Sequence, residues 1–279
     1  MLGKNMRTLG ERISIVLCVA IWCLIPGAAK AQSSQSVYQL NWAVDGAITG
    51  VGLAAWVLPQ LFVDKLASSH CPCASEDVNG LDRSTAGAWR PGVALTSDVL
   101  VGTTYGLAFA LDAIDVVAKP GGGVAWLEDA MVIAESAVIA GALTSTTKVI
   151  VQRPRPLVYG RSTGDPLLDN GDNFTSFFSG HTAGAFAIGL SMAQTYALRH
   201  PNSALRFVMY GAAILLGSGI ATLRVASGKH FPSDVLVGAA VGSAVGLTIP
   251  WLHQRAPAAQ LAWSAQPGGM VLSIAVFGQ

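Results

Sequence analysis

The stretch Lys148–Pro156, with the sequence KVIVQRPRP, follows a long apolar segment and opens a polar connection. The run that it begins, residues 148–161, holds four basic residues and no acid. Such a concentration of positive charge suits an anionic ligand, because arginine can grip a phosphate through two parallel hydrogen bonds. Pro154 and Pro156 stiffen the backbone between these side chains. Taken alone, the segment is also compatible with a solvated basic loop at a membrane surface, and Arg153 faces either a substrate head group or solvent.

Long apolar segments dominate the chain on both sides of this stretch. Of its 279 residues, 52% are hydrophobic and 12% are charged, against about 25% charged residues in an ordinary soluble domain, which excludes a disordered chain. A formal net charge of +1 leaves no broad basic face for nucleic acid. Segment length and Ala/Gly/Leu/Val content favour helices over strands, so we expect an all-α bundle of about six core helices. The expected helices cover approximately residues 40–63, 92–117, 124–147, 181–198, 207–223 and 234–253.

The N-terminal 31 residues have the pattern of a secretory signal peptide. Three basic residues precede an apolar run from Ile13 to Ala28, and Ala29-Lys30-Ala31 then forms a cleavage site. The run is shorter than the ~20 residues of a spanning helix, although an uncleaved membrane anchor is the alternative. We divide the rest into an N-terminal helix with a cysteine-containing loop (32–85), a main helical domain (86–253) and a tail (254–279). The turn sequence QPGG at 266–269 predicts a short β-hairpin in that tail.

Two cysteines remain after this signal peptide, Cys71 and Cys73, in the sequence His70-Cys71-Pro72-Cys73. An oxidising compartment favours a disulfide, whereas one histidine and two cysteines are an incomplete zinc site. We therefore expect a local disulfide or free thiols in a surface loop, rather than a redox or metal site.

Two further polar clusters lie at the ends of expected helices. Ser179-Gly180-His181 opens the fourth core helix, where a serine N-cap and free backbone N–H groups make an anion site and a histidine can donate a proton. His230 precedes Asp234 by four residues, so the carboxylate can orient the imidazole and leave its other nitrogen as a nucleophile or base. Each cluster alone is a weak signal.

Together the three clusters resemble the three-part signature of the type 2 phosphatidic acid phosphatase family, which shares its site with vanadium-dependent haloperoxidases. The resemblance covers about residues 86–253, and the spacing within each part matches. Two positions depart from the family pattern, with Phe178 in place of Pro and Leu223 in place of Ser; neither supplies a catalytic group. The matching parts are Lys148-x6-Arg155-Pro156, Ser179-Gly180-His181 and Arg224-x5-His230-x3-Asp234.

The resemblance implies a helical bundle of the phosphatase/haloperoxidase type and a metal-independent phosphatase domain over 86–253. His230 is expected to form a phosphohistidine, Asp234 to orient it, and His181 to protonate the departing oxygen and then activate water. No metal ion or cofactor is implied. The expected phosphate-binding residues are Lys148, Arg155, Ser179, Gly180 and Arg224.

The resemblance also implies a phosphate monoester or pyrophosphate substrate, either a phosphorylated lipid or a small soluble phosphomonoester. We favour a lipid phosphate, membrane association and an extracytoplasmic site; a soluble periplasmic acid phosphatase is the first alternative. A vanadium haloperoxidase is the second alternative, and it is ranked lower because those enzymes are generally longer than this chain. A non-catalytic lipid-phosphate-binding membrane protein is the third.

The expected number of membrane crossings conflicts with an active site on the extracytoplasmic side. If the mature N-terminus lies outside and three helices cross the membrane, Lys148 lies inside the cell. Either the first mature segment does not span, or the signal is retained and another segment fails to cross, or the domain is a hydrophobic body in the periplasm.

Overall fold

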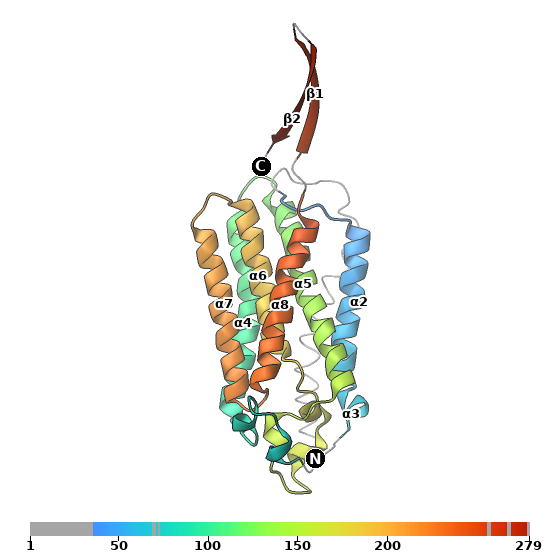
Figure 1. The fold of residues 1–279 in the computed structure, drawn as a ribbon, viewed down its shortest axis with the longest axis vertical. Helices are drawn as coiled ribbons and strands as arrows, with labels where there is room; N and C mark the ends of the chain where they lie inside the picture. The colour runs from blue at the N-terminus through green and yellow to red at the C-terminus, as the bar shows by residue number, and fades with distance from the viewer. Residues whose placement is uncertain (1–35, 69–70, 72, 256–257, 267–268, 278–279) are drawn as a thin grey trace.

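Six long helices run side by side in the computed structural model, which describes residues 36–68, 71, 73–255, 258–266 and 269–277 (Figure 1). The predicted signal peptide lies outside these residues. The all-α bundle is as predicted, and each predicted helix is found within a few residues of its expected ends. The long helices are α2 (Trp42–Leu61), α4 (Pro91–Val116), α5 (Gly122–Val151), α6 (Gly180–Arg199), α7 (Leu205–Ala226) and α8 (Pro232–His253).

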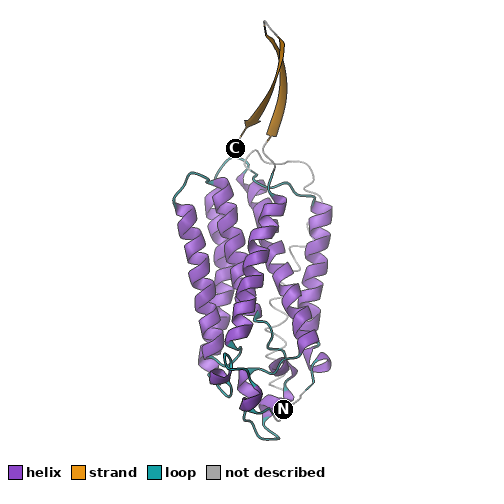
Figure 2. Ribbon diagram, in the orientation of Figure 1, coloured by secondary structure: helices purple, strands orange, loops and turns teal. Residues whose placement is uncertain are grey.

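Short helical turns occupy the connections. The α-helical turn α3 (Val63–Leu66) follows α2 directly. The 3₁₀ turns are η2 (Ser75–Asp77), η3 (Arg83–Thr85), η4 (Pro156–Val158), η5 (Pro166–Asp169) and η6 (Gly171–Phe174). Figure 2 shows that the long connections gather at the lower end of the bundle, where α2, α5 and α7 end and α4, α6 and α8 begin. Segments far apart in the sequence therefore meet at this end.

Helix α6 is the centre of the bundle, since it contacts α4, α5, α7 and α8. Most of its residues are buried, and its contact with α8 is close because α8 presents a glycine every four residues. A Cβ atom at Gly242 would lie 2.2 Å from the carbonyl oxygen of Ala183, and one at Gly238 would lie 2.7 Å from that of Ser179. These glycines let the two backbones approach, as small residues do between membrane helices.

Helix α2 is part of the same bundle, packed along α5. The ring of Trp56 fills the space above Gly141, where a Cβ would lie 2.3 Å from Cδ2 of the indole, and Ser145 donates a hydrogen bond to the carbonyl of Trp56 at 2.8 Å. Helix α2 thus lies beside α5 within the bundle. Because successive long helices alternate in direction, Trp42 and Lys148 lie at opposite ends of the bundle (Figure 1).

Five of the long helices, α2, α4, α5, α7 and α8, are long and apolar enough to cross a membrane. All five carry large apolar side chains on the surface, such as Ile114 at 77% exposure and Leu215 at 74%. Helix α6 carries none, because α4, α5, α7 and α8 surround it. This distribution is that of a bundle whose outer faces contact lipid, and the protein is membrane-associated.

The predicted C-terminal hairpin is present. Strands β1 (Ala258–Gln266) and β2 (Gly269–Phe277) pair antiparallel, with Ala258 opposite Phe277 and Gln266 opposite Gly269. The hairpin projects beyond the upper end of the bundle, away from the long connections (Figure 1).

Candidate active site

The three predicted clusters meet at the lower end of the bundle. The connection between α5 and α6 supplies Arg155, and the turn between α7 and α8 supplies His230. The two connections are joined directly, because the backbone N–H of Ser179 donates to the carbonyl of Asp234 at 3.1 Å. Helix α5 extends to Val151, so Lys148 lies in its last turn, half-buried.

His230 is almost fully buried, with its two ring nitrogens facing different partners. Nε2 lies 3.4 Å from a terminal nitrogen of Arg155, and Nδ1 lies 3.5 Å from Oδ2 of Asp234. Within the described part of the chain, Nδ1 has no hydrogen bond. Burial lowers the pKa of His230 well below its usual value, and the positive charges of Arg155 and Arg224 lower it further. The imidazole is therefore neutral near pH 7, the state in which a ring nitrogen can act as a nucleophile.

Asp234 is held in place from several directions. Its Oδ2 accepts hydrogen bonds from the Ser176 hydroxyl at 2.5 Å and from the backbone N–H of Phe231 at 2.9 Å, the latter capping α8. Its Oδ1 accepts one from Arg153 at 2.6 Å. With no exposed surface, this carboxylate has one orientation, and His230 takes its position relative to it.

Arg155 is buried and donates hydrogen bonds to residues on both connections, Asp172 and Lys229. Its guanidinium donates to the carboxylate of Asp172 at 2.8 Å, to the carbonyl of Asp172 at 2.8 Å and to the carbonyl of Lys229 at 3.1 Å. Although burial opposes ionisation, the positive charge of Arg155 lowers the pKa of Asp172. The arginine is thus fixed with one edge beside His230, where it can contact an oxygen of a bound phosphate.

Arg224 and His181 share one partner, the carboxylate of Asp98 in α4. Oδ1 of Asp98 lies 2.7 Å from a guanidinium nitrogen of Arg224 and 2.8 Å from Nε2 of His181. The Asp98 side chain is about half exposed, whereas that of Arg224 is 4% exposed. One oxygen atom of Asp98 therefore lies within hydrogen-bond distance of both a predicted phosphate-binding residue, Arg224, and the predicted proton donor, His181.

Ser179 and Gly180 begin α6 as predicted. Oγ of Ser179 accepts the hydroxyl of Thr182 at 2.9 Å and faces the backbone N–H of Thr182 at 3.4 Å, so Ser179 is the N-cap. A Cβ at Gly180 would lie 3.1 Å from Cγ2 of Thr144. Free N–H groups in this first turn carry the positive end of the helix dipole.

The structure brings Arg153 neither to open solvent nor to the phosphate contacts. Its guanidinium bridges Asp82 at 2.8 Å and Asp234 at 2.6 Å, and it lies 4.3 Å from the ring centroid of Phe231. Both interpretations from the sequence were therefore wrong. Arg153 holds the carboxylate of Asp234 in place, on the side of the histidine–aspartate pair away from Arg155.

Three residues that the sequence analysis did not assign belong to this site. Asp82 is fully buried and accepts from Ser233 and Asn79 as well as from Arg153, and these donors lower its pKa against the effect of burial. Asp98 joins Arg224 and His181. Lys229 lies 5.1 Å from the ring centroid of Trp89, and burial lowers its pKa to about 8. No local pattern marks Asp82 or Asp98, but Lys229 directly precedes His230.

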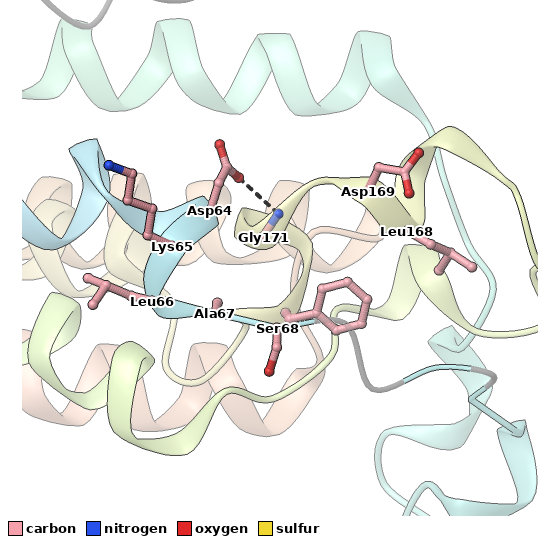
Figure 3. Close-up of a pocket in the computed structure, with 9 residues that line it drawn as sticks. Asp64, Lys65, Leu66, Ala67, Ser68, Leu168, Asp169 and Gly171 are labelled. Carbon is pink, nitrogen blue, oxygen red and sulfur yellow. Dashed lines mark hydrogen bonds between the residues drawn. The ribbon is translucent and has the colours of Figure 1, made fainter.

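A separate shallow pocket lies beside the same end of the bundle, between α3 and the turns η5 and η6 (Figure 3). The side chain of Asp64 points toward Gly171 and accepts its backbone N–H at 3.0 Å. Its lining contains none of the predicted catalytic residues. The hydrogen bond ties α3 to the connection that carries Asp172.

The cysteine loop closes with a local disulfide between Cys71 and Cys73 at this end of the molecule. The expectation of a local bridge or free thiols is resolved in favour of the bridge.

Comparison with known proteins agrees with the resemblance seen in the motifs. No curated protein matches the chain. A crystal structure of a transmembrane PAP2-type phosphatidylglycerolphosphate phosphatase from Bacillus subtilis aligns at 18% identity and a TM-score of 0.35, covering 86% of this chain and 94% of that one. The family model of the PAP2 superfamily matches residues 129–258, a segment that contains all eight predicted site residues. Residues 129–258, which carry these motifs, are thus similar to the PAP2 superfamily.

Proposed function

We propose that the protein is a metal-independent phosphatase of lipid phosphates that works through a phosphohistidine at His230. The observation that carries this proposal is the neutral, buried imidazole held between Arg155 and Asp234, 3.4 Å from the former and 3.5 Å from the latter. A neutral ring nitrogen beside a fixed cation and opposite a fixed carboxylate is the arrangement required to attack phosphorus and then to carry positive charge.

The first step transfers the phosphoryl group to the enzyme. Nε2 of His230 forms a bond to phosphorus while the bond to the leaving oxygen breaks, and Asp234 stabilises the charge that the imidazole acquires. Oδ1 of Asp98 marks the position of a substrate oxygen, because it lies 2.8 Å from Nε2 of His181. A leaving oxygen in that position would receive its proton from His181.

The second step hydrolyses the phosphohistidine. His181, now neutral, takes a proton from water as the water oxygen attacks phosphorus, and the bond to His230 breaks to release inorganic phosphate. Lys148, Arg155 and Arg224 are placed to hold the phosphoryl oxygens in both steps, and such positioning and electrostatics supply most of the catalysis in phosphoryl transfer.

A lipid substrate is supported by the surface of the bundle. Five helices expose large apolar side chains along lengths that suit a bilayer, and the site lies at the end of this surface, where lipid head groups would be found. A soluble acid phosphatase would expose such side chains to water, so the first alternative is disfavoured.

An extracytoplasmic site is supported by the disulfide between Cys71 and Cys73 at the catalytic end, because disulfides persist in oxidising compartments. With this orientation and α2 in the membrane, Trp42 begins on the cytoplasmic side. A cleaved signal peptide would instead place the start of α2 outside the cell, so the cleaved signal peptide stays a prediction that this topology opposes.

Phosphate release by purified protein in detergent tests the substrate class. We expect kcat/KM for phosphatidate, phosphatidylglycerophosphate or undecaprenyl pyrophosphate to exceed that for p-nitrophenyl phosphate by tenfold or more. Intact cells producing the protein should also hydrolyse p-nitrophenyl phosphate added outside. A lack of release from every ester would contradict the proposed activity, whereas release only after permeabilisation would contradict the orientation alone.

Replacing Arg153 tests whether it acts on substrate or through Asp234. Because Arg153 lies behind Asp234, we expect Arg153→Gln to lower kcat by about 10- to 100-fold with little change in KM, since small misplacements of a reacting group cost rates of this order. The matched control is Arg161→Gln, whose arginine pairs with Asp165 at 3.2 Å at the edge of the same connection. A raised KM with an unchanged kcat would instead place Arg153 on the substrate.

A further inference from the structure

We propose that Asp45, Glu135 and His253 form a binding site for one divalent transition-metal ion, such as Zn²⁺, near the end of the bundle opposite to the active site. The residues come from the start of α2, the middle of α5 and the last turn of α8. His253 follows Asp234 by 19 residues on one helix, which corresponds to about 28 Å. The site is thus separate from the phosphatase chemistry.

The spacing of the three side chains suits a small metal ion. Nε2 of His253 lies 3.4 Å from Oδ1 of Asp45 and 3.5 Å from Oε2 of Glu135, and all three atoms lie within 4.8 Å of one another. Ligands about 2.0–2.2 Å from a tetrahedral zinc ion are separated by about 3.3–3.6 Å. Both distances from the imidazole therefore match the edges of a zinc coordination tetrahedron.

The histidine presents a ligand atom rather than a proton. Its Nδ1 lies 2.9 Å from the backbone carbonyl of Ile249, which can only accept, so Nδ1 carries the hydrogen and the lone pair of a neutral ring is on Nε2. A backbone carbonyl on the other ring nitrogen is the usual support for a metal-ligating histidine. That lone pair points toward two carboxylates, an arrangement that is repulsive unless a cation lies between them.

Glu135 provides the second, independent observation. Its side chain is 3% exposed, and its Oε2, although directed at His253, accepts no hydrogen bond from the residues that the structure describes. Asp45 uses Oδ2 to accept the backbone N–H of Asn41 at 2.7 Å, which leaves Oδ1 for the cluster. A buried carboxylate oxygen with no donor is costly, and a coordinated metal ion would satisfy it.

A proton on His253 is the competing occupant, and the distances disfavour it. Charge-assisted N–H···O bonds are usually about 2.7–2.9 Å long, whereas both separations here exceed 3.3 Å. Among the described residues, the charged groups that act on Glu135 are His253 and Asp45, with no lysine or arginine among them. A divalent ion would neutralise both carboxylates, whereas one proton would neutralise one.

The ion would have a structural role. It would join α2 to α5 and α8 near the upper end of the bundle, whereas α2 packs mainly on α5 elsewhere. Zinc and similar ions prefer this mixture of imidazole and carboxylate ligands, and a water molecule would complete the tetrahedron.

Metal analysis of the purified full-length protein tests the site. After stripping with EDTA and dialysis against Zn²⁺, we expect one bound ion per chain, and at least tenfold weaker binding in Asp45→Asn, Glu135→Gln and His253→Gln. The matched control is His200→Gln, which removes a histidine near the same end that lies 2.8 Å from Asp115. Equal zinc content in the wild-type protein and the His253→Gln protein would overturn the proposal.

Two measurements on the wild-type protein keep the test decisive if these variants fail to fold. Co²⁺ should give the visible absorption of a tetrahedral site with one imidazole ligand, displaced by Zn²⁺, and absence of this spectrum would overturn the proposal. EDTA should lower Tm while leaving phosphate release intact at the assay temperature. Loss of phosphate release in EDTA without a change in Tm would instead contradict metal-independent catalysis and the metal site together, whereas an unchanged Tm alone would contradict only the metal site.

Discussion

Phosphate release should fall by about 10⁴-fold or more in His230→Asn, because the nitrogen that attacks phosphorus is removed while Lys148, Arg155 and Arg224 remain to bind substrate. Asn is chosen because His230 is almost fully buried beside Arg155, and a smaller side chain would leave a cavity there. The wild-type protein mixed rapidly with a ³²P-labelled ester should form an acid-labile, base-stable phosphoenzyme, and the variant should form none. Near-normal turnover in His230→Asn would contradict the assignment of the nucleophile.

The control for this variant is His200→Asn, in which a histidine at the opposite end of the bundle is removed. It should retain both phosphate release and the phosphoenzyme. Thermal melting of the two variants then separates loss of chemistry from loss of fold.

His181→Ala should lower the rate on alkyl phosphates by about 10²- to 10⁴-fold, the range expected for loss of a general acid. Nε2 of His181 lies 2.8 Å from the oxygen position that Asp98 marks, so we expect it to protonate the leaving alkoxide. A p-nitrophenolate leaves without a proton, and formation of the phosphoenzyme from p-nitrophenyl phosphate should therefore be affected far less.

The two esters provide an internal control, because the same variant is compared on a substrate whose leaving group needs a proton and on one whose leaving group does not. Single-turnover measurements are needed, since His181 also activates water in the second step. An equal loss of phosphoenzyme formation on both esters would assign His181 to phosphate binding rather than to proton transfer.

Local sequence was sufficient for the helices of this protein. Apolar runs bounded by glycine, proline and polar residues predict the six long helices to within a few residues, and QPGG at 266–269 predicts the hairpin. The one informative error is at the end of α5, which continues to Val151, so that Lys148 projects from a helix rather than from a loop. The expected helix stopped before the charge of Lys148, whereas the apolar residues Val149, Ile150 and Val151 continue it by another turn.

Contacts between residues far apart in the chain could not be predicted from local sequence patterns. Asp98 precedes Arg224 by 126 residues, and Asp82 precedes Arg153 by 71, yet each pair is in direct contact. Several acids lie in or beside the early helices, and nothing near Asp82 or Asp98 in the sequence distinguishes them from the others. The opposite placement of Arg153 and Arg155, two residues apart, also depends on which carboxylate each one meets.

By itself, the sequence determined the helical fold and predicted the resemblance to the phosphatase family and the side chains proposed for the phosphate chemistry, because periodicity and motif spacing are properties of short segments. Only the tertiary structure decided that Arg153 supports Asp234, that Asp98 lies between Arg224 and His181, and that Asp45, Glu135 and His253 converge. The reason is physical: a buried charge is stable only beside a partner, and the partner is selected by how the helices pack rather than by its position along the chain.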